Sequence, residues 1–180
     1  MKARFNAHGE LILEEVKGSE IVFRHLSGVK EPGNKYGERA FSVEISDELA
    51  EELNAAGWKV SFGQEKPEGN GKYSSKIKVD LYFDSEYWRP TIRRYSSDGY
   101  DILDKENVID IQSDQIESAA MVIRPRRSKT ENGGDGMIHG KLKQMRYKLE
   151  EDPLAGVYDN DTDYSDGPED MVDSEELPFE

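Results

Sequence analysis

The chain has 180 residues, no cysteine and a formal net charge of −14 at pH 7. Without cysteine, neither a disulfide scaffold nor a thiolate metal site can form, and the apolar runs are too short for a membrane-spanning helix. The amino terminus, Met1–Phe5, lacks the apolar stretch of a signal peptide, so we expect a soluble protein of the cytoplasm with no membrane partner.

The negative charge is concentrated at the carboxyl end. Residues 150–180 contain 13 acidic residues and no Lys or Arg, whereas residues 1–149 contain 25 acidic and 24 basic residues. We therefore predict one near-neutral domain over residues 1–149, a usual size for one hydrophobic core. Residues 150–180 are predicted to be a disordered acidic tail, because their scattered apolar residues cannot offset the entropy cost of folding.

Most of residues 1–149 alternates between apolar and polar positions, as half-buried β-strands do. One helix is predicted between Ser46, which can cap its amino end, and Gly57, which can end it. Trp58 follows that helix and is assigned to the core. The strand pattern occurs, in chain order, at residues 11–16, 21–23, 40–45, 58–62 and 76–83.

The last two predicted strands differ from the others. Ala119–Ile123 is a continuous apolar run that we expect to end at Arg124-Pro125, because proline cannot donate to a ladder. The final strand, Met137–Leu149, changes the phase of its alternation. This change predicts a β-bulge near Lys143-Gln144.

The loops at 64–73 and 128–136 are rich in turn-forming residues and predict hairpin-like connections. Many short strands with one short helix favour a mainly β fold, namely an OB-fold-like five-stranded barrel. In that fold, oligonucleotides lie across one strand face and between two loops. The loop before the last strand would be one of those two.

Cations and aromatic rings are interleaved in several segments. Single-stranded nucleic acid needs this mixture, since cations contact phosphates and rings stack on bases at roughly 1–3 kcal/mol per base. The ordinary alternative is a solvated charged surface with rings packed between strands. The candidate nucleic-acid-binding residues are Arg24, Arg39, Lys76, Lys78, Tyr82, Trp88, Arg89, Arg93, Arg94, Tyr95, Arg124, Arg126, Arg127, Lys129, Lys141 and Lys143.

Motifs of catalysis and metal binding do not occur. The chain contains no HExxH, no GxxxxGK[ST] and no GxGxxG, so we expect neither an enzyme nor a cofactor. The tail has aspartates at a spacing similar to a calcium loop, but Tyr164 stands where that loop needs glycine, and we predict no metal site. A tail that only confers solubility would not need the apolar end Leu177-Pro178-Phe179.

The order of several segments resembles the single-stranded DNA-binding proteins of tailed bacteriophages, a divergent group built on an OB-fold. The tail is similar to the acidic-apolar tip of bacterial and phage proteins of this kind, although Glu180 follows Phe179. The stretches that carry the resemblance are Ile21–Arg24, Glu38–Val43, Asp47–Leu53, Gly57–Val60, Met121–Pro125 and Gly140–Lys143.

The resemblance implies protection of single-stranded DNA during phage replication or recombination in the host cytoplasm, without catalysis. The tail would compete with DNA for the groove and recruit replication or recombination proteins, and a homo-oligomer is left open. The alternative is an acidic protein-interaction or DNA-mimic protein with a β-barrel scaffold. The residues implied in partner binding are Glu175, Glu176, Leu177, Pro178 and Phe179.

Overall fold

The computed structural model describes residues 1–151, in which nine β-strands, one α-helix and three short 3-10 helices occur. The predictions about the tail tip lie outside the described residues. The elements in chain order are β1 (Lys2–Phe5), β2 (Leu11–Lys17), η1 (Gly18–Glu20), β3 (Ile21–His25), β4 (Ala40–Ile45), α1 (Asp47–Ala55), β5 (Ser75–Asp80), β6 (Thr91–Ser96), β7 (Gly99–Leu103), η2 (Val108–Gln112), β8 (Ile116–Arg127), η3 (Thr130–Asn132) and β9 (Ile138–Leu149).

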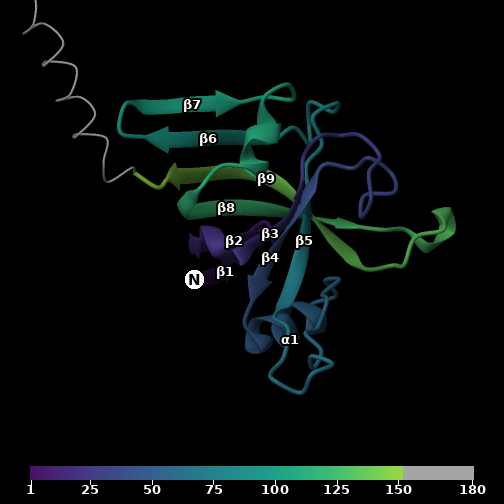
Figure 1. Ribbon diagram of the computed structural model, residues 1–180. Helices are drawn as coiled ribbons and strands as arrows, with labels where there is room; N and C mark the ends of the chain where they lie inside the picture. The colour runs from purple at the N-terminus through teal and green to yellow at the C-terminus, as the bar shows by residue number, and fades with distance from the viewer. Residues whose placement is uncertain (152–180) are drawn as a thin grey trace, which may run out of the picture. The chain divides into compact units, whose positions relative to one another are not determined.

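The strands form one strongly bent sheet in the order β1-β2-β8-β9-β5-β4-β3 (Figure 1). No ladder joins its two ends among the described residues. Instead η1 links β2 directly to β3, so one bent segment passes from β8 to β4. At the bend, a side chain on Gly18 would place its Cβ 1.9 Å from the backbone oxygen of Ile116, so only glycine fits.

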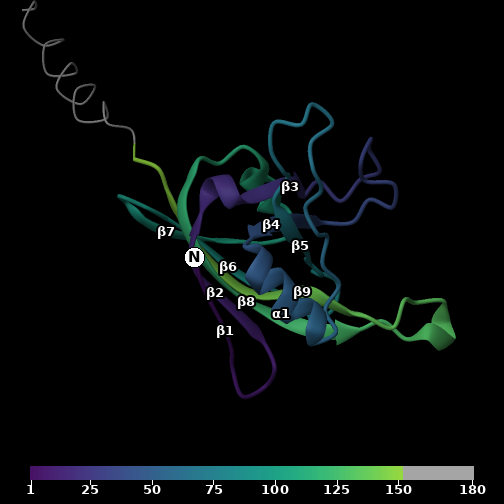
Figure 2. The same cartoon turned by 90° about the horizontal axis from the view of Figure 1, so that it is seen from below.

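This topology confirms the mainly β, OB-fold-like prediction. The bent β2–β3 segment with β4, β5, β8 and β9 supplies the five expected strands, and β5 runs parallel to β9. The strands β1, β6 and β7 are additions. Figure 2 shows the β6–β7 hairpin beside β9, and β6 pairs with β9 in parallel beyond the point where β5 ends.

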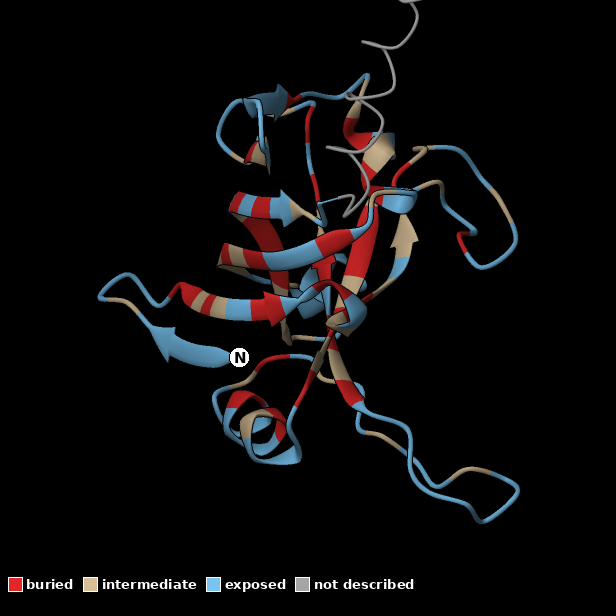
Figure 3. Cartoon of the chain, turned by 60° about the vertical axis from the view of Figure 1, so that its left-hand side comes forward, coloured by how far each residue is buried: buried red, intermediate tan, exposed pale blue. Residues whose placement is uncertain are grey.

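The core lies on the inner face of this bent sheet. Buried and exposed residues alternate along the central strands, as Figure 3 shows. The helix prediction is confirmed: Ser46 accepts a hydrogen bond from the Leu49 amide at 3.2 Å, and Leu53 is fully buried. Trp58 is buried in the core, as predicted.

The predicted bulge is confirmed in β9. Ile123 pairs with Leu142 and Val122 pairs with Gln144, so Lys143 is the extra residue. The phase change of the sequence therefore keeps Leu142 and Met145 both in the core. The two hairpin loops are also confirmed by backbone hydrogen bonds that close them, from Tyr73 to Gln64 at 2.8 Å and from Ser128 to Met137 at 2.9 Å.

Two strand predictions were wrong in detail. β8 does not end at Pro125 but continues to Arg127. The pairing of β2 with β8 begins at Ile123, so on that side the rest of β8 is a sheet edge, where proline is tolerated. The segment 58–62 is not a strand, since its backbone bonds first to β9 and then to β5. Phe23 also departs from the expected alternation: at a φ of 51° its side chain is exposed.

Candidate nucleic-acid interface

Six of the aromatic and basic side chains meet on the outer face of the sheet, and we call them the aromatic–basic cluster. The rings come from the segment that follows β5, two arginines come from the end of β8, and the lysine comes from β9. Strand register explains the meeting, because Arg124 pairs with Lys141, which pairs in turn with Asp80 at the end of β5. The members are Tyr82, Tyr87, Trp88, Arg124, Arg126 and Lys141.

The cations of the cluster lie over its rings. The Lys141 ammonium is 4.6 Å from the centre of the Tyr82 ring, and the Arg124 guanidinium is 4.8 Å from that of Tyr87. Arg126 lies 5.7 Å from Trp88 and 5.8 Å from Tyr82. Such contacts hold rings and cations together. The Tyr87 side chain remains 68% exposed and that of Tyr82 39% exposed, so both rings are accessible to an unpaired base.

Two carboxylates beside the cluster fix two of its cations. Lys141 is only 6% exposed and pairs with Asp80 at 2.6 Å. Buried Glu10 lies 3.1 Å from Lys143 and 3.5 Å from Arg124. Burial opposes ionisation of Glu10, but its hydrogen bonds to Asn6 and Lys143, with the positive charges nearby, outweigh burial and lower its pKa.

The cations therefore differ in their availability to phosphate. Lys78 is engaged by Glu38 at 2.7 Å and by Asp80 at 3.5 Å. Burial acts to lower the pKa of Lys78, but these carboxylates raise it overall. Within residues 1–151, neither Arg126 nor Lys129 has a carboxylate partner. Both cations can therefore contact a phosphate without first giving up an ion pair.

The loop between β8 and β9 borders the cluster. Together with the ends of β5, β8 and β9 it forms a cleft of about 550 Å³, lined by Arg126, Lys129 and Tyr82 among others. Asp135 fixes this loop by contacts with His139 at 3.0 Å and Lys59 at 3.2 Å. The hydrogen bond with His139 is the main reason that the pKa of Asp135 lies well below its usual range.

Of the other predicted cations, Arg127 lines this cleft, whereas Arg39, Arg89 and Lys76 do not. Arg127 donates to the Gly136 carbonyl at 2.7 Å, and Arg89 donates to the Phe83 carbonyl at 3.0 Å. The Arg39 guanidinium is 6.0 Å from the same Phe83 ring. Lys76 lies further along β5, where it donates to the Ser74 carbonyl. None of these four cations forms an ion pair with a carboxylate within 4 Å among the described residues, although Asp84 is close enough to Arg39 and Arg89 for their charges to lower its pKa.

Two predicted cations have internal partners instead. Arg24 donates to four backbone carbonyls, those of Gly18, Ile21, Ile111 and Asp114, at 2.9 Å each, and burial lowers its pKa. These bonds tie β3 to η2. They occupy the guanidinium donors that a phosphate would need.

Arg94 is the second cation with internal partners. It lies 3.1 Å from Asp110, 3.2 Å from Asp101 and 3.4 Å from Asp114. Its neighbours on β6, Arg93 and Tyr95, face the other side of that strand and lie outside the cluster. Sequence spacing alone places all three residues together and cannot show this separation.

Tyr87 is missing from the predicted set, although its contact with Arg124 makes it part of the cluster. Its signal was its position next to Trp88, whose ring it meets edge-on at 5.0 Å between ring centres. Tyr100, an exposed ring on β7, is also missing, because the β6–β7 hairpin was not recognised as a pair of strands. Sequence alone did not indicate where these rings would face.

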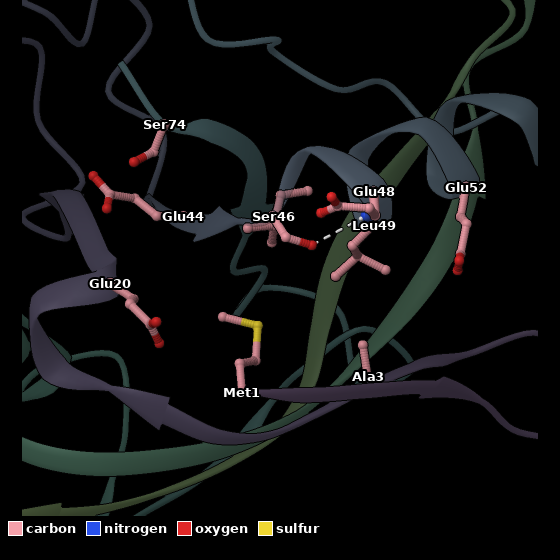
Figure 4. Close-up of a pocket in the computed structure, with 10 residues that line it drawn as sticks. Met1, Ala3, Glu20, Glu44, Ser46, Glu48, Leu49, Glu52 and Ser74 are labelled. Atoms are coloured by element: carbon pink, nitrogen blue, oxygen red, sulfur yellow. Dashed lines mark hydrogen bonds between the residues drawn. The ribbon is translucent and has the colours of Figure 1, made fainter. Parts of the chain in front are cut away.

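The cleft beside α1 has the opposite charge. It measures about 560 Å³, and four glutamates line it from β4, α1 and η1 (Figure 4). Like charges repel, so this region is unsuited to a polyanion. The glutamates are Glu20, Glu44, Glu48 and Glu52.

No helix in residues 1–151 is long and apolar enough to cross a membrane. A family model described as "Putative phage ssDNA-binding domain" matches residues 3–175. Comparison with curated protein sequences gave no match.

Among solved structures, the chain is similar to the single-stranded DNA-binding protein of bacteriophage Enc34. In its complex with single-stranded DNA the identity is 14%, the TM-score 0.48, and the match covers 85% of this chain and 93% of that one. For the same protein, described without DNA, the identity is 15% and the TM-score 0.47, and the match covers 85% of this chain and 88% of that one. For its C-terminal truncation, the identity is 14% and the TM-score 0.46, and the match covers 85% of this chain and 91% of that one.

Proposed function

The chain belongs to the phage single-stranded DNA-binding domain family, and we propose that the aromatic–basic cluster is where it binds single-stranded DNA. The observation that carries this proposal is the meeting of three accessible or half-exposed rings with three cations on one face of an otherwise near-neutral domain. No other group of described residues combines rings and cations as densely.

The chemistry of binding follows from the two kinds of side chain. Arg126 and Lys129 contact phosphates, since no carboxylate competes for them within residues 1–151. Unpaired bases stack on Tyr82, Tyr87 or Trp88, which double-stranded DNA cannot do because its bases are already stacked. The carboxylates of Asp80 and Glu10 hold Lys141 and Arg124 in place, so the rings that these cations contact are preorganised.

In this proposal the protein does not catalyse a reaction. It protects single-stranded DNA during phage replication or recombination in the host cytoplasm. The acidic tail, residues 150–180, competes with DNA for the cluster and presents Leu177, Pro178 and Phe179 to replication or recombination proteins. The tail charge of 13 acidic residues against no basic ones supports the competition.

A fluorescence-polarisation titration tests the binding. Single-stranded and double-stranded oligonucleotides of one sequence are titrated with the full chain at two salt concentrations. We expect tighter binding of the single strand, and weaker binding as salt rises because phosphate contacts release counterions. Equal affinity for both forms would refute the proposal.

Two variants refine the test. Arg126→Ala should weaken binding and reduce the salt slope by about 0.7, the value for one phosphate contact on a single strand. Lys105→Ala removes a cation outside the cluster, one that pairs with Asp84, and is the matched control. Removing residues 150–180 should leave affinity unchanged or increase it, and weaker binding would contradict the competition by the tail.

A further inference from the structure

The outer face of the β8–β9 ribbon continues past the aromatic–basic cluster. On β8 the even-numbered residues from Ser118 to Arg126 share this face, because the odd-numbered residues Ala119, Met121 and Ile123 are buried. On β9, Lys141 belongs to the same face through its pairing with Arg124. One side of the ribbon is therefore a single surface from end to end.

The bulge decides which β9 side chains this surface carries. In a regular strand, Lys141 would share its face with odd-numbered residues, and Met145 and Tyr147 would point outward. The extra residue Lys143 shifts the phase, so Met145 and Tyr147 are buried and Arg146 is exposed on the outer face. The bulge thus places Arg146 on the surface that carries the cluster.

The β6–β7 hairpin extends this surface sideways. In the parallel pairing of β6 with β9, Arg93 lies opposite Arg146 and Tyr95 lies opposite Lys148. Tyr95 in turn pairs with Tyr100 on β7. We call Arg93, Tyr95, Tyr100 and Arg146 the distal strip.

The geometry of the distal strip repeats that of the cluster. The Arg93 guanidinium lies 5.6 Å from the centre of the Tyr100 ring, and the Tyr95 and Tyr100 rings are 5.4 Å apart. Tyr100 is 56% exposed. A cation over a ring, next to a second ring, therefore recurs at the far end of the same sheet face.

The charges of the strip are also available. Arg93 and Arg146 have no carboxylate partner within residues 1–151, in contrast to Arg94, which points to the other side of β6 and contacts three aspartates. Alternation along one strand thus assigns one arginine to the interior ion pairs and the next to the surface. Arg93, the outward arginine, forms no ion pair with a carboxylate of the described residues.

The strip borders a shallow cleft of about 500 Å³ on the surface of β2, β8 and β9. The cleft is lined by Ser118 and Ala120, whose side chains are small, and by Tyr95 and Arg146 among others. A groove that carries cations and an aromatic ring has the two features with which proteins bind single-stranded nucleic acid.

We propose that the distal strip is a second contact segment for single-stranded DNA, occupied by the same strand that crosses the aromatic–basic cluster. This inference rests on the proposed function. Single-stranded DNA is the occupant because the strip shares one sheet face with the cluster and has the same pairing of unneutralised cations with exposed rings. From His139, opposite Arg126, to Arg146 the surface spans roughly 23 Å along β9, so only a longer oligonucleotide reaches both.

Oligonucleotide length separates the two segments experimentally. Polarisation titrations with oligothymidylates of about 6 and about 20 nucleotides, within and beyond the usual range for one OB-fold, are run on the full chain and on the Arg146→Ala/Tyr100→Ala variant. We expect the variant to bind the short oligonucleotide within about twofold of wild type. Its affinity for the long one should fall about tenfold, as for the loss of one stacking contact and one phosphate contact.

The control variant is Lys66→Ala/Tyr73→Ala, which removes another surface cation over a tyrosine ring, 5.6 Å apart, on the 64–73 hairpin. It should retain the wild-type gain in affinity with length. Because Arg146 and Tyr100 are exposed, the Tm of the strip variant should stay close to that of wild type. If the double variant is unstable, Arg146→Ala alone should show part of the loss of affinity for the long oligonucleotide.

Three results would overturn the inference. The strip variant could bind the short oligonucleotide and still gain as much affinity for the long one as wild type does. That result rejects the distal strip and leaves the proposed function intact. An equal loss of the gain in the control variant shows that the gain is not located on the strip. Failure of the wild-type chain to bind either oligonucleotide rejects the proposed function and this inference with it.

Discussion

The buried ion pair between Lys141 of the cluster and Asp80 predicts an asymmetry between its two partners. Lys141 is 6% exposed and its ammonium lies 2.6 Å from one Asp80 oxygen, while the other Asp80 oxygen lies 3.5 Å from Lys78. Asp80→Ala would leave the Lys141 charge buried without a counterion. Lys141→Met would leave Asp80 with Lys78 as a second cation and would fill the same space with an apolar chain.

The expected magnitudes follow from this difference. Removing one partner of a buried pair costs about 3–5 kcal/mol because the remaining charge is left uncompensated. In Lys141→Met this cost is smaller, since Asp80 keeps Lys78 as a counterion. For a domain of this size about 1 kcal/mol corresponds to roughly 2–4 °C in Tm. We therefore expect Asp80→Ala to lower the Tm by roughly 6–20 °C and Lys141→Met to lower it by only about 0–4 °C.

Differential scanning calorimetry at pH 7 measures both variants, and urea unfolding gives the free energies independently. Glu38→Ala, which removes the exposed partner of Lys78, serves as a control and should change the Tm by no more than about 3 °C. Equal destabilisation by Asp80→Ala and Lys141→Met would refute the reasoning, since Lys78 would then give Asp80 no compensation.

Three further outcomes are expected. Tyr82→Ala should weaken single-stranded DNA binding by roughly 5–150-fold in a polarisation titration, the loss of one stacked base, whereas Tyr82→Phe should bind almost as wild type. Burial and the hydrogen bond to Asp114 raise the pKa of Tyr147, so its contribution to stability is complete below about pH 10 and is lost as the pH rises further. Urea unfolding at a series of pH values should show this loss of stability, and Tyr147→Phe should not show it. Gly18→Ala should prevent stable folding or lower the Tm by more than about 6 °C in a thermal melt, because its Cβ would overlap the Ile116 carbonyl, and a wild-type melt would contradict the close approach at the bend.

Local features of the fold could be predicted from sequence because short-range patterns determine them. The capped helix after Ser46 and the phase change around Lys143 both depend on neighbouring residues, and both are confirmed. The β6 strand was missed because Arg94 faces inward toward aspartates, which hides the apolar alternation on which strand prediction depends. Pro125 likewise suggested that the strand ends there. The strand continues because β2 no longer pairs with β8 beyond Ile123, so the missing N–H of proline costs no ladder hydrogen bond.

The candidate site was predictable in composition but not in arrangement. Nothing local relates Asp80 to Lys141, because they meet through the parallel pairing of β5 with β9, 61 residues apart. The same applies to Arg24, whose carbonyl partners Ile111 and Asp114 are 87 and 90 residues away in sequence. Long-range pairing decides which cations face a ligand and which hold the fold, and sequence spacing cannot distinguish them.

The two tryptophans allow the most direct test of the central claim, that single-stranded DNA binds at the aromatic–basic cluster. Trp88 belongs to the cluster and is half-buried, whereas Trp58 is buried in the core. Intrinsic fluorescence is measured during titration with single-stranded oligonucleotide for the full chain and for Trp88→Phe, which keeps Trp58 as the reporter. We predict quenching in the wild type and almost none in Trp88→Phe, with binding retained by polarisation. Binding without any change in Trp88 fluorescence would contradict the claim, because DNA would then contact another part of the protein.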